Sequence, residues 1–361
     1  KDAIGRGVDV KVVYHARSKN PAKDKTREKN EAAIKAAGLE AVVTPRKENP
    51  QTAIMHDKFV VWLQKQGSGD PKPVAVWTGS TNWTDGGVYG QLNVGHAIYE
   101  DDVAATYESL FDALRQDLDA SDQKKHLAAL TPVSLMLPGE HKIIPIFSPQ
   151  DSDTMLHLYA GLADNAKMLL VSAPFALSPV ILAVLAKKRD DVLRFMLLDK
   201  MGSLGKGEEV HMIQGDPSDS IAVATTISSP LHDFQGKILE GKEGFHHAGI
   251  HIHSKIIMVD PFGSDPVIIT GSANFSRNST EENDSNSLVI RGYTSVADIY
   301  ATEFMRMFEH YHFRAKHEAA QGSTKASDKP LGLVEDDSWS DKYFVSGSTE
   351  EKDRRMFAGT M

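Results

Sequence analysis

Residues 253–260 have the sequence His-Ser-Lys-Ile-Ile-Met-Val-Asp, and residues 267–274 have the sequence Val-Ile-Ile-Thr-Gly-Ser-Ala-Asn. Both contain the short apolar run that is typical of a buried strand. His253 and Lys255 are two residues apart, so on a strand their side chains point to the same face. The next strand brings Ser272 and Asn274 to a turn. The pattern predicts that an imidazole, an ammonium, a hydroxyl and a carboxamide converge, a set suited to phosphoryl oxygens.

The same set occurs a second time in the chain. His56 and Lys58 repeat the first spacing, and Ser80 and Asn82 repeat the second, again after a glycine. A predicted strand and amphipathic helix follow each set, over 93–114 and 285–307. A repeated order of motifs and elements is the sign of an internal duplication.

Strands that alternate with helices predict an α/β fold with mixed sheets. We expect a first domain over 1–135, a second over 140–318 and a polar tail over 319–361. The second copy opens with a predicted helix over 156–166 and a strand over 167–173, for which the first copy has no counterpart. The first copy therefore lacks its first βα unit.

Shorter elements are also predicted. In the first copy we expect strands over 8–14 and 39–44, and a basic helix over 22–37 that ends at Gly38. Three aromatic residues in the tail predict that it docks on the body: Trp339, Tyr343 and Phe344. The chain starts without a methionine or a signal peptide, so we expect an incomplete amino terminus. We expect a soluble protein, secreted or cytoplasmic.

Composition excludes several classes of site. The 361 residues include no cysteine, which excludes disulfides, Cys-ligated zinc and thiol catalysis. The net charge of −9 is not that of a duplex-DNA binder. The first 50 residues nevertheless hold 12 basic and 7 acidic residues, concentrated between Arg17 and Lys29. This stretch is either a solvated helix face or a basic lip for a phosphate-bearing substrate.

With these motifs the chain resembles the phospholipase D superfamily. Its signature, the HKD motif, is His-x-Lys-x4-Asp, followed by Gly-Ser-x-x-Asn or Gly-Ser-x-Asn. The resemblance extends to about residue 318. It implies two tandem phospholipase D-like α/β/α domains, related by a pseudo-twofold axis, whose motifs form one active site. Because both motifs lie in one chain, we expect a monomer.

The resemblance also implies roles for the matched residues. One of His56 and His253 attacks phosphorus and forms a phosphohistidine, while the other protonates the leaving oxygen and then activates water or an alcohol. The family uses no metal or other cofactor. The remaining matched residues clamp the phosphoryl oxygens or help to bind them: Lys58, Lys255, Asn82, Asn274, Ser80 and Ser272.

The sequence departs from the family pattern at three positions. Leu63 stands where the first motif should have an aspartate. Asn93 and Ser285 stand where the family has an acidic residue that steadies a histidine, and we count both as candidates for substrate binding. Asp260 is kept, and we expect it to anchor the end of its strand in support of the site.

Two aromatic residues follow the motif asparagines. Trp83 and Phe275 either pack in the core or shape the substrate pocket. His246, His247, His251 and His253 invite a metal site, but no carboxylate completes a ligand set at a suitable spacing. We therefore predict no metal.

The leading hypothesis is a phosphodiesterase that hydrolyses phospholipids or transfers their phosphatidyl group to an alcohol (transphosphatidylation), with peripheral contact to a membrane surface. A metal-independent nuclease is the alternative, and a catalytically weakened binding module is the third hypothesis. We predict that the imidazoles of His56 and His253 lie within about 8 Å of each other. If Asp260 supports His253 as the acid, His56 is the nucleophile.

Overall fold

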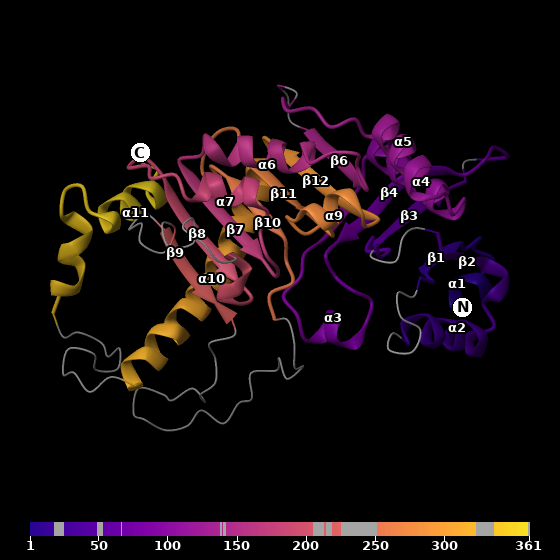
Figure 1. Cartoon of the computed structure of the whole chain (residues 1–361), viewed down its shortest axis with the longest axis horizontal. Helices are drawn as coiled ribbons and strands as arrows, with labels where there is room; N and C mark the ends of the chain where they lie inside the picture. Colours follow the sequence, from indigo (N-terminus) through magenta and orange to yellow (C-terminus); the bar gives the residue numbers. More distant parts are fainter. Residues whose placement is uncertain are drawn as a thin grey trace.

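Mixed sheets with helices packed on them form the protein, as the computed structural model shows (Figure 1). The structure describes residues 1–17, 25–48, 53–65, 67–137, 139, 142–204, 213, 219–224, 251–322 and 336–359. No helix in these ranges is both long enough and apolar enough to span a bilayer. The predicted α/β fold class is confirmed.

The second domain is built on a seven-stranded sheet with the order β6-β12-β11-β10-β7-β8-β9. The strands are β6 (Lys142–Ser148), β7 (Met168–Ala173), β8 (Leu193–Leu198), β9 (Asp219–Val223), β10 (Ile256–Val259), β11 (Val267–Gly271) and β12 (Ser285–Arg291). Neighbours from β6 to β7 pair antiparallel, and β7, β8 and β9 pair in parallel. Strands β7, β8 and β10 are buried along their whole length, as continuous apolar runs predict.

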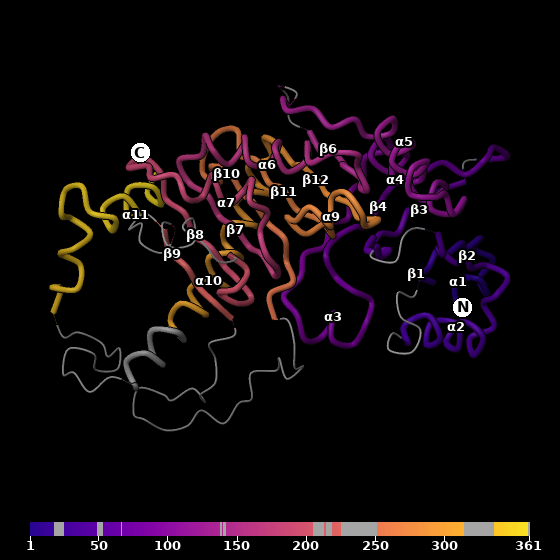
Figure 2. The backbone as a smooth tube through the Cα atoms, in the orientation of Figure 1, coloured from indigo at the N-terminus to yellow at the C-terminus, as the bar shows by residue number. Residues whose placement is uncertain are grey.

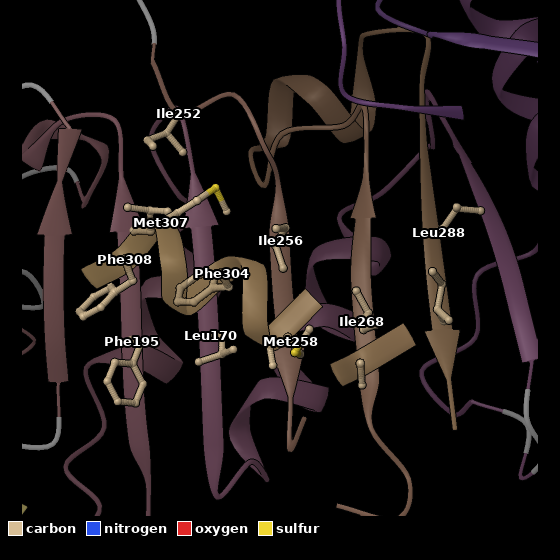
Figure 3. Packing of buried hydrophobic residues seen from close by; sticks show 14 of the residues in the cluster. Leu170, Phe195, Ile252, Ile256, Met258, Ile268, Leu288, Phe304, Met307 and Phe308 are labelled. Carbon is tan, nitrogen blue, oxygen red and sulfur yellow. The ribbon is translucent and has the colours of Figure 1, made fainter. Parts of the chain in front are cut away.

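Helices cover both faces of this sheet. On one face lie α6 (Thr154–Asp164) and α7 (Pro179–Leu185), which bury their apolar side chains against alternate strand residues. On the other face lies α10 (Thr294–Gly322), whose Phe304 packs over Leu170 and whose Phe308 packs over Phe195 (Figure 3). The short helix α9 (Arg277–Glu281) follows the turn after β11.

The first domain repeats this arrangement in two smaller sheets. Strands β1 (Val12–His15) and β2 (Val43–Arg46) pair in parallel, and β3 (Phe59–Gln64), β4 (Lys72–Gly79) and β5 (Gly95–Ile98) pair antiparallel. Its helices are α1 (Asp2–Gly5), α2 (Thr26–Ala37), α3 (Asp85–Tyr89), α4 (Asp101–Arg115) and α5 (Ala120–Leu130). The counterparts of β1 and β3 in the second domain, β8 and β10, are joined by β7, whereas β1 and β3 belong to separate sheets. The lack of a first βα unit stays a prediction, in which β1 and β3 have no strand that corresponds to β7 between them.

One core continues from the first domain into the second. Tyr107 on α4 is fully buried, and its ring lies 5.0 Å from that of Phe147 on β6. The same cluster includes Val76 and Ile98 of the first domain and Leu170 of the second. Because packed aromatic pairs resist displacement, this shared core holds the two copies in a fixed relation.

Several predicted boundaries are corrected. The strand expected from residue 8 begins at Val12, and the strand expected over 39–44 is a 3-10 turn, Glu40–Val42, before β2. Helix α2, expected from residue 22, begins at Thr26 with Lys25 as its N-cap, and residues 18–24 lie outside the described ranges. It ends at Gly38, as predicted, with a left-handed φ of 65° that suits glycine.

The tail contacts the body through residues other than those predicted. Helix α11 (Thr349–Phe357) places the Phe357 ring 6.1 Å from Phe195, and the neighbouring Met356 is buried. Trp339 and Phe344 are instead 60% and 67% exposed. The amino terminus and the tail lie at opposite ends of the molecule in Figure 2.

Asp260 ends β10 and ties it to β7. Its Oδ1 accepts hydrogen bonds of 2.8 Å from the backbone N–H groups of both Lys167 and Met168. Its backbone has a positive φ of 48°, a conformation that aspartate tolerates better than most residues. The prediction that Asp260 anchors its strand end is confirmed.

We therefore expect Asp260→Ala to lower the free energy of unfolding by roughly 1–3 kcal/mol, because two backbone donors lose their acceptor. The melting temperature measures this loss. Asp9→Ala, at a side chain that is 81% exposed, is the matched control and should leave it unchanged. An unchanged melting temperature in Asp260→Ala would contradict the anchoring role.

Candidate active site

The two motif histidines face each other where the two copies meet. The ring centroids of His56 and His253 are 6.4 Å apart, and the ring planes are inclined by 70°. The predicted separation of less than about 8 Å is confirmed. Both imidazoles can therefore reach a single phosphorus atom placed between them.

Reciprocal backbone hydrogen bonds hold this pair. The His56 N–H donates to the carbonyl of Asp284 over 2.7 Å, and the His253 N–H donates to the carbonyl of Leu92 over 2.9 Å. Asp284 and Leu92 occupy matching places, directly before Ser285 and Asn93. Each histidine is thus fixed by the other copy, which is the relation that a pseudo-twofold axis requires.

The motif lysines lie beside their histidines. Lys58 Nζ donates to the His56 carbonyl over 2.5 Å, and Lys255 Nζ donates to the His253 carbonyl over 2.7 Å. Lys255 Nζ is also 3.0 Å from His253 Nε2, so both side chains project to one side, as predicted. These residues do not lie on strands, however. They precede β3 and β10 in extended segments whose partners lie in the other copy.

The glycines of the Gly-Ser turns allow a close approach of two backbones. A Cβ on Gly79 would lie 2.2 Å from the Val94 carbonyl oxygen, and one on Gly271 would lie 2.4 Å from that of Asn286. Only glycine fits such contacts. The approach lets Ser80 N–H donate to the Val94 carbonyl, and Ser272 N–H to that of Asn286.

Burial of several basic groups together dominates the electrostatics. The side chains of Lys58 and Lys255 are 8% and 0% exposed. Burial lowers the pKa of Lys58 to about 7, and burial together with the charge of Lys58 lowers that of Lys255 well below its usual value. Burial and both lysines lower the pKa of His253 to about 3, and the pKa of His56 falls well below 6.5 for the same reasons. Both shifts favour the neutral imidazole in the free protein.

An acidic residue behind the site was not singled out in the sequence. Asp57 lies between the motif histidine and lysine, and its Oδ1 accepts 2.7 Å from Asn286 Nδ2. Burial raises its pKa to about 7. The alternation of side chains in an extended segment could have placed it on the face opposite His56, but no local pattern indicates its partner on β12.

A buried ion cluster supports the carbonyl that holds His56. Asp284 is fully buried, and its Oδ2 accepts from Arg17 Nη2 over 2.6 Å and from Arg46 Nε over 3.2 Å. Arg17 is therefore a structural residue and not part of a basic lip. The predicted cations Lys19 and Lys23 lie outside the described residues.

The motif asparagines and the aromatic residues that follow them differ in burial. Asn82 is half-buried, and Asn274 donates its backbone N–H to Ser279 Oγ over 2.9 Å. Trp83 is 60% exposed, whereas Phe275 is 3% exposed and packs against Tyr159 in the core. Phe275 is thus a packing residue, because α6 covers it.

No group of three or more histidine and acidic side chains gathers as metal ligands within the described ranges. His246 and His247 fall outside those ranges. Asp260 lies beyond β10, at the end opposite His253, and binds backbone donors there. The premise that it supports His253 was therefore wrong.

A known protein family matches more than half of the chain. The family model described as "Cardiolipin synthase, PLD-like domain" matches residues 1–115 and 196–308. The chain belongs to this phospholipase D-like family. Both motif lysines and both histidines fall within the two matched regions. No curated protein sequence matches the chain.

One solved structure with a TM-score above 0.5 shares the fold, and two others match 47% of this chain. Phosphatidylserine synthase from Haemophilus influenzae Rd KW20 is 11% identical with a TM-score of 0.55, over 86% of this chain and 75% of that one. Nuc from Salmonella typhimurium is 19% identical with a TM-score of 0.32, over 47% of this chain and 95% of that one. NucT from Helicobacter pylori is 15% identical with a TM-score of 0.34, over 47% and 97%.

The pKa of Lys58 near 7 predicts a pH-dependent affinity for anions. The ammonium is charged below that pH and neutral above it. Sulfate keeps its charge throughout, so its affinity should be roughly tenfold higher at pH 6 than at pH 8. Isothermal titration measures the difference.

Lys58→Arg should remove most of this pH dependence, because a guanidinium stays charged. Lys188→Arg, at an exposed lysine, is the control and should retain it. Equal sulfate affinity at both pH values in the unmodified protein would contradict the assignment.

Proposed function

We propose that the protein transfers the phosphatidyl group of a phospholipid through a covalent phosphohistidine, to water or to an alcohol. The observation that carries this proposal is the pair of imidazoles 6.4 Å apart, flanked by two buried lysines. A phosphodiester is an anion that resists attack by a nucleophile. The two ammonium groups supply the positive charge that offsets it.

The low pKa values of both histidines suit the first step. A neutral imidazole has a free lone pair for attack on phosphorus. When the anionic substrate binds, its charge favours protonation of the second imidazole, which can then donate to the leaving oxygen. The site therefore acquires its acid only when a substrate is present.

The surface beside the site favours a lipid. After Asn82 the chain forms the loop that bears α3, which stands apart from the sheets in Figure 1. Trp83, Val88 and Tyr89 in this loop are 60%, 53% and 75% exposed. The matching loop of the second copy is buried at Phe275 and Thr280. Exposed apolar side chains in a cluster are typical of a contact surface, and this one adjoins a phosphodiester site.

The surface evidence for nucleic acid is weaker. The described lysine and arginine at the start of α2 are neutralised locally, since Lys25 pairs with Glu28 and Arg27 with Glu31. A backbone-binding surface needs cations that are available to phosphates. The family description also names a phospholipid-synthesising enzyme. A nuclease activity is therefore the outcome that the assay must exclude.

The decisive assay offers vesicles of phosphatidylglycerol, phosphatidylethanolamine or phosphatidylcholine with glycerol as acceptor, beside single-stranded DNA, all in EDTA. We expect a released head group or a new phospholipid by mass spectrometry. Turnover should stay within about twofold of that without EDTA, because the lysines supply the charge. Lys255→Met should abolish it and Lys188→Met should not. Cleavage of DNA alone would establish the nuclease, and binding without turnover the binding module.

The α3 loop gives a second test. Trp83→Ala and Tyr89→Ala should each lower activity on vesicles about tenfold, because each removes an apolar side chain worth roughly 1–2 kcal/mol at a lipid surface. Activity on a soluble short-chain phospholipid should not change. Tyr99→Ala is the matched control, at a tyrosine that is 74% exposed and directly follows β5. Equal losses on both substrates would show that the loop does not act through the membrane.

A further inference from the structure

Asn93 has a carboxamide whose orientation is fixed by its partners. Its Nδ2 donates to the Gly87 carbonyl over 2.9 Å, and a carbonyl can only accept. Its Oδ1 is 2.8 Å from Ser80 Oγ and 2.9 Å from His253 Nδ1. The loop at Gly87 thus fits an amide at position 93 rather than the carboxylate that the family pattern has there.

A directed chain of hydrogen bonds ends at His253. Val94 N–H donates to Ser80 Oγ over 3.0 Å, so the Ser80 hydroxyl has its own proton free to donate to Asn93 Oδ1. This oxygen therefore acts as an acceptor toward His253, and Nδ1 must carry the ring proton. Nε2 is left with its lone pair, which accepts from Lys255 Nζ at 3.0 Å.

The second copy begins the same chain but does not complete it. Asn286 N–H donates to Ser272 Oγ over 3.0 Å, matching Val94 and Ser80. The Ser272 hydroxyl then donates to the Asn286 carbonyl over 3.3 Å. Ser285 stands in the place of Asn93 and has a shorter side chain. Within the described residues, Ser285 Oγ and His56 Nδ1 are both buried without a hydrogen-bond partner.

We propose that Asn93 is a positioning residue that holds His253 in the Nδ1–H tautomer. His253 Nε2 is then the nucleophile and His56 the proton donor and acceptor. This inference rests on the proposed function. It reverses the assignment expected from the sequence, which depended on an Asp260 contact that the structure does not have.

The proposed reaction has two steps, in which each bond formed is matched by a bond broken. The Nε2 lone pair of His253 forms the bond to phosphorus, the bond from phosphorus to the leaving oxygen breaks, and that oxygen takes a proton from the protonated His56. In the second step water or an alcohol gives its proton to His56 and its oxygen bonds to phosphorus. The nitrogen–phosphorus bond breaks and its electron pair returns to Nε2. Nδ1–H stays bonded to Asn93 throughout.

The amide also sets the charge around the intermediate. Among the described residues, the charges that act on the pKa of His253 are those of Lys255 and Lys58, both cations, and His56 is the imidazole that faces it. A phosphorylated imidazole that keeps Nδ1–H is cationic, and a neutral amide stabilises it less than a carboxylate does. An amide thus favours a short-lived intermediate.

Nitrogen NMR of protein labelled with ¹⁵N-histidine tests the tautomer without any substrate, with His253→Ala to assign the signals. We expect Nδ1 of His253 to be protonated in the unmodified protein. Asn93→Leu removes the acceptor and should give a mixture of tautomers. Asn165→Leu, which removes an exposed amide that donates to the Gly161 carbonyl, is the matched control. A protonated Nε2 of His253 in the unmodified protein would overturn the proposal.

Trapping identifies the nucleophile. Acid-free digestion after rapid mixing with a nitrophenyl phosphodiester should place the phosphoryl group on His253. Asn93→Leu should slow its formation by roughly 10- to 10⁴-fold, the upper figure being the loss known for a histidine in the wrong tautomer. Phosphorylation of His56 would refute the assignment. If no histidine is phosphorylated, the proposed function fails, while the NMR result still decides the role of Asn93.

The pH profile separates positioning from mere packing. Asn93→Asp places a carboxylate beside His253, which favours the imidazolium and raises its pKa. The acidic limb of kcat/KM should then move to higher pH, and the phosphohistidine should accumulate. Asn165→Asp, the same change at an exposed amide, should leave this limb in place. A purely structural Asn93 would lower activity in Asn93→Asp equally at all pH values, and that result would contradict the proposal.

Discussion

Two backbone hydrogen bonds between the copies, from His56 to Asp284 and from His253 to Leu92, are the constraint on which the site depends. Each bond places a motif histidine against the first residues of a strand in the other copy. Asn93, which follows the acceptor Leu92, then contacts His253 of the opposite copy, and Ser285 holds the matching place after Asp284. Neither copy contains a complete site, since a histidine and the group that orients it come from different halves of the chain.

The buried charges near His56 differ in whether they have partners of opposite charge. Asp284 is buried with two arginines, so its charge is neutralised and the cluster is structural. Lys58 and Lys255 are buried beside imidazoles, and their pKa values fall as a result. Unpaired cations in a buried place are costly unless an anion arrives. In the proposed function, the free energy of that burial is recovered when a phosphodiester binds.

The sequence was sufficient to predict most of the strands and helices, and to predict that the two motifs lie close together. Apolar runs predicted most strands, and Gly38 marked the end of α2, because these depend on neighbours along the chain. The sequence could not show that Asn93 meets His253, 160 residues away. It also failed for Asp260, because the spacing of a motif does not say which backbone donors lie across the sheet. Trp83 and Phe275 hold the same motif position, yet α6 covers only Phe275.

The two copies share their backbone contacts but differ in the side chains beside the histidines. Gly79 and Gly271 permit the same close approach, and Ser80 and Ser272 accept the same backbone hydrogen bond, so the main chain keeps its twofold relation. The proposed two-step transfer is not symmetric, because one imidazole must bond to phosphorus while the other carries a proton. A pair of identical environments could not favour one division of these roles over the other. The difference between Asn93 and Ser285 breaks the symmetry at the ring nitrogens, where the reaction needs it, without disturbing the backbone that brings the rings together.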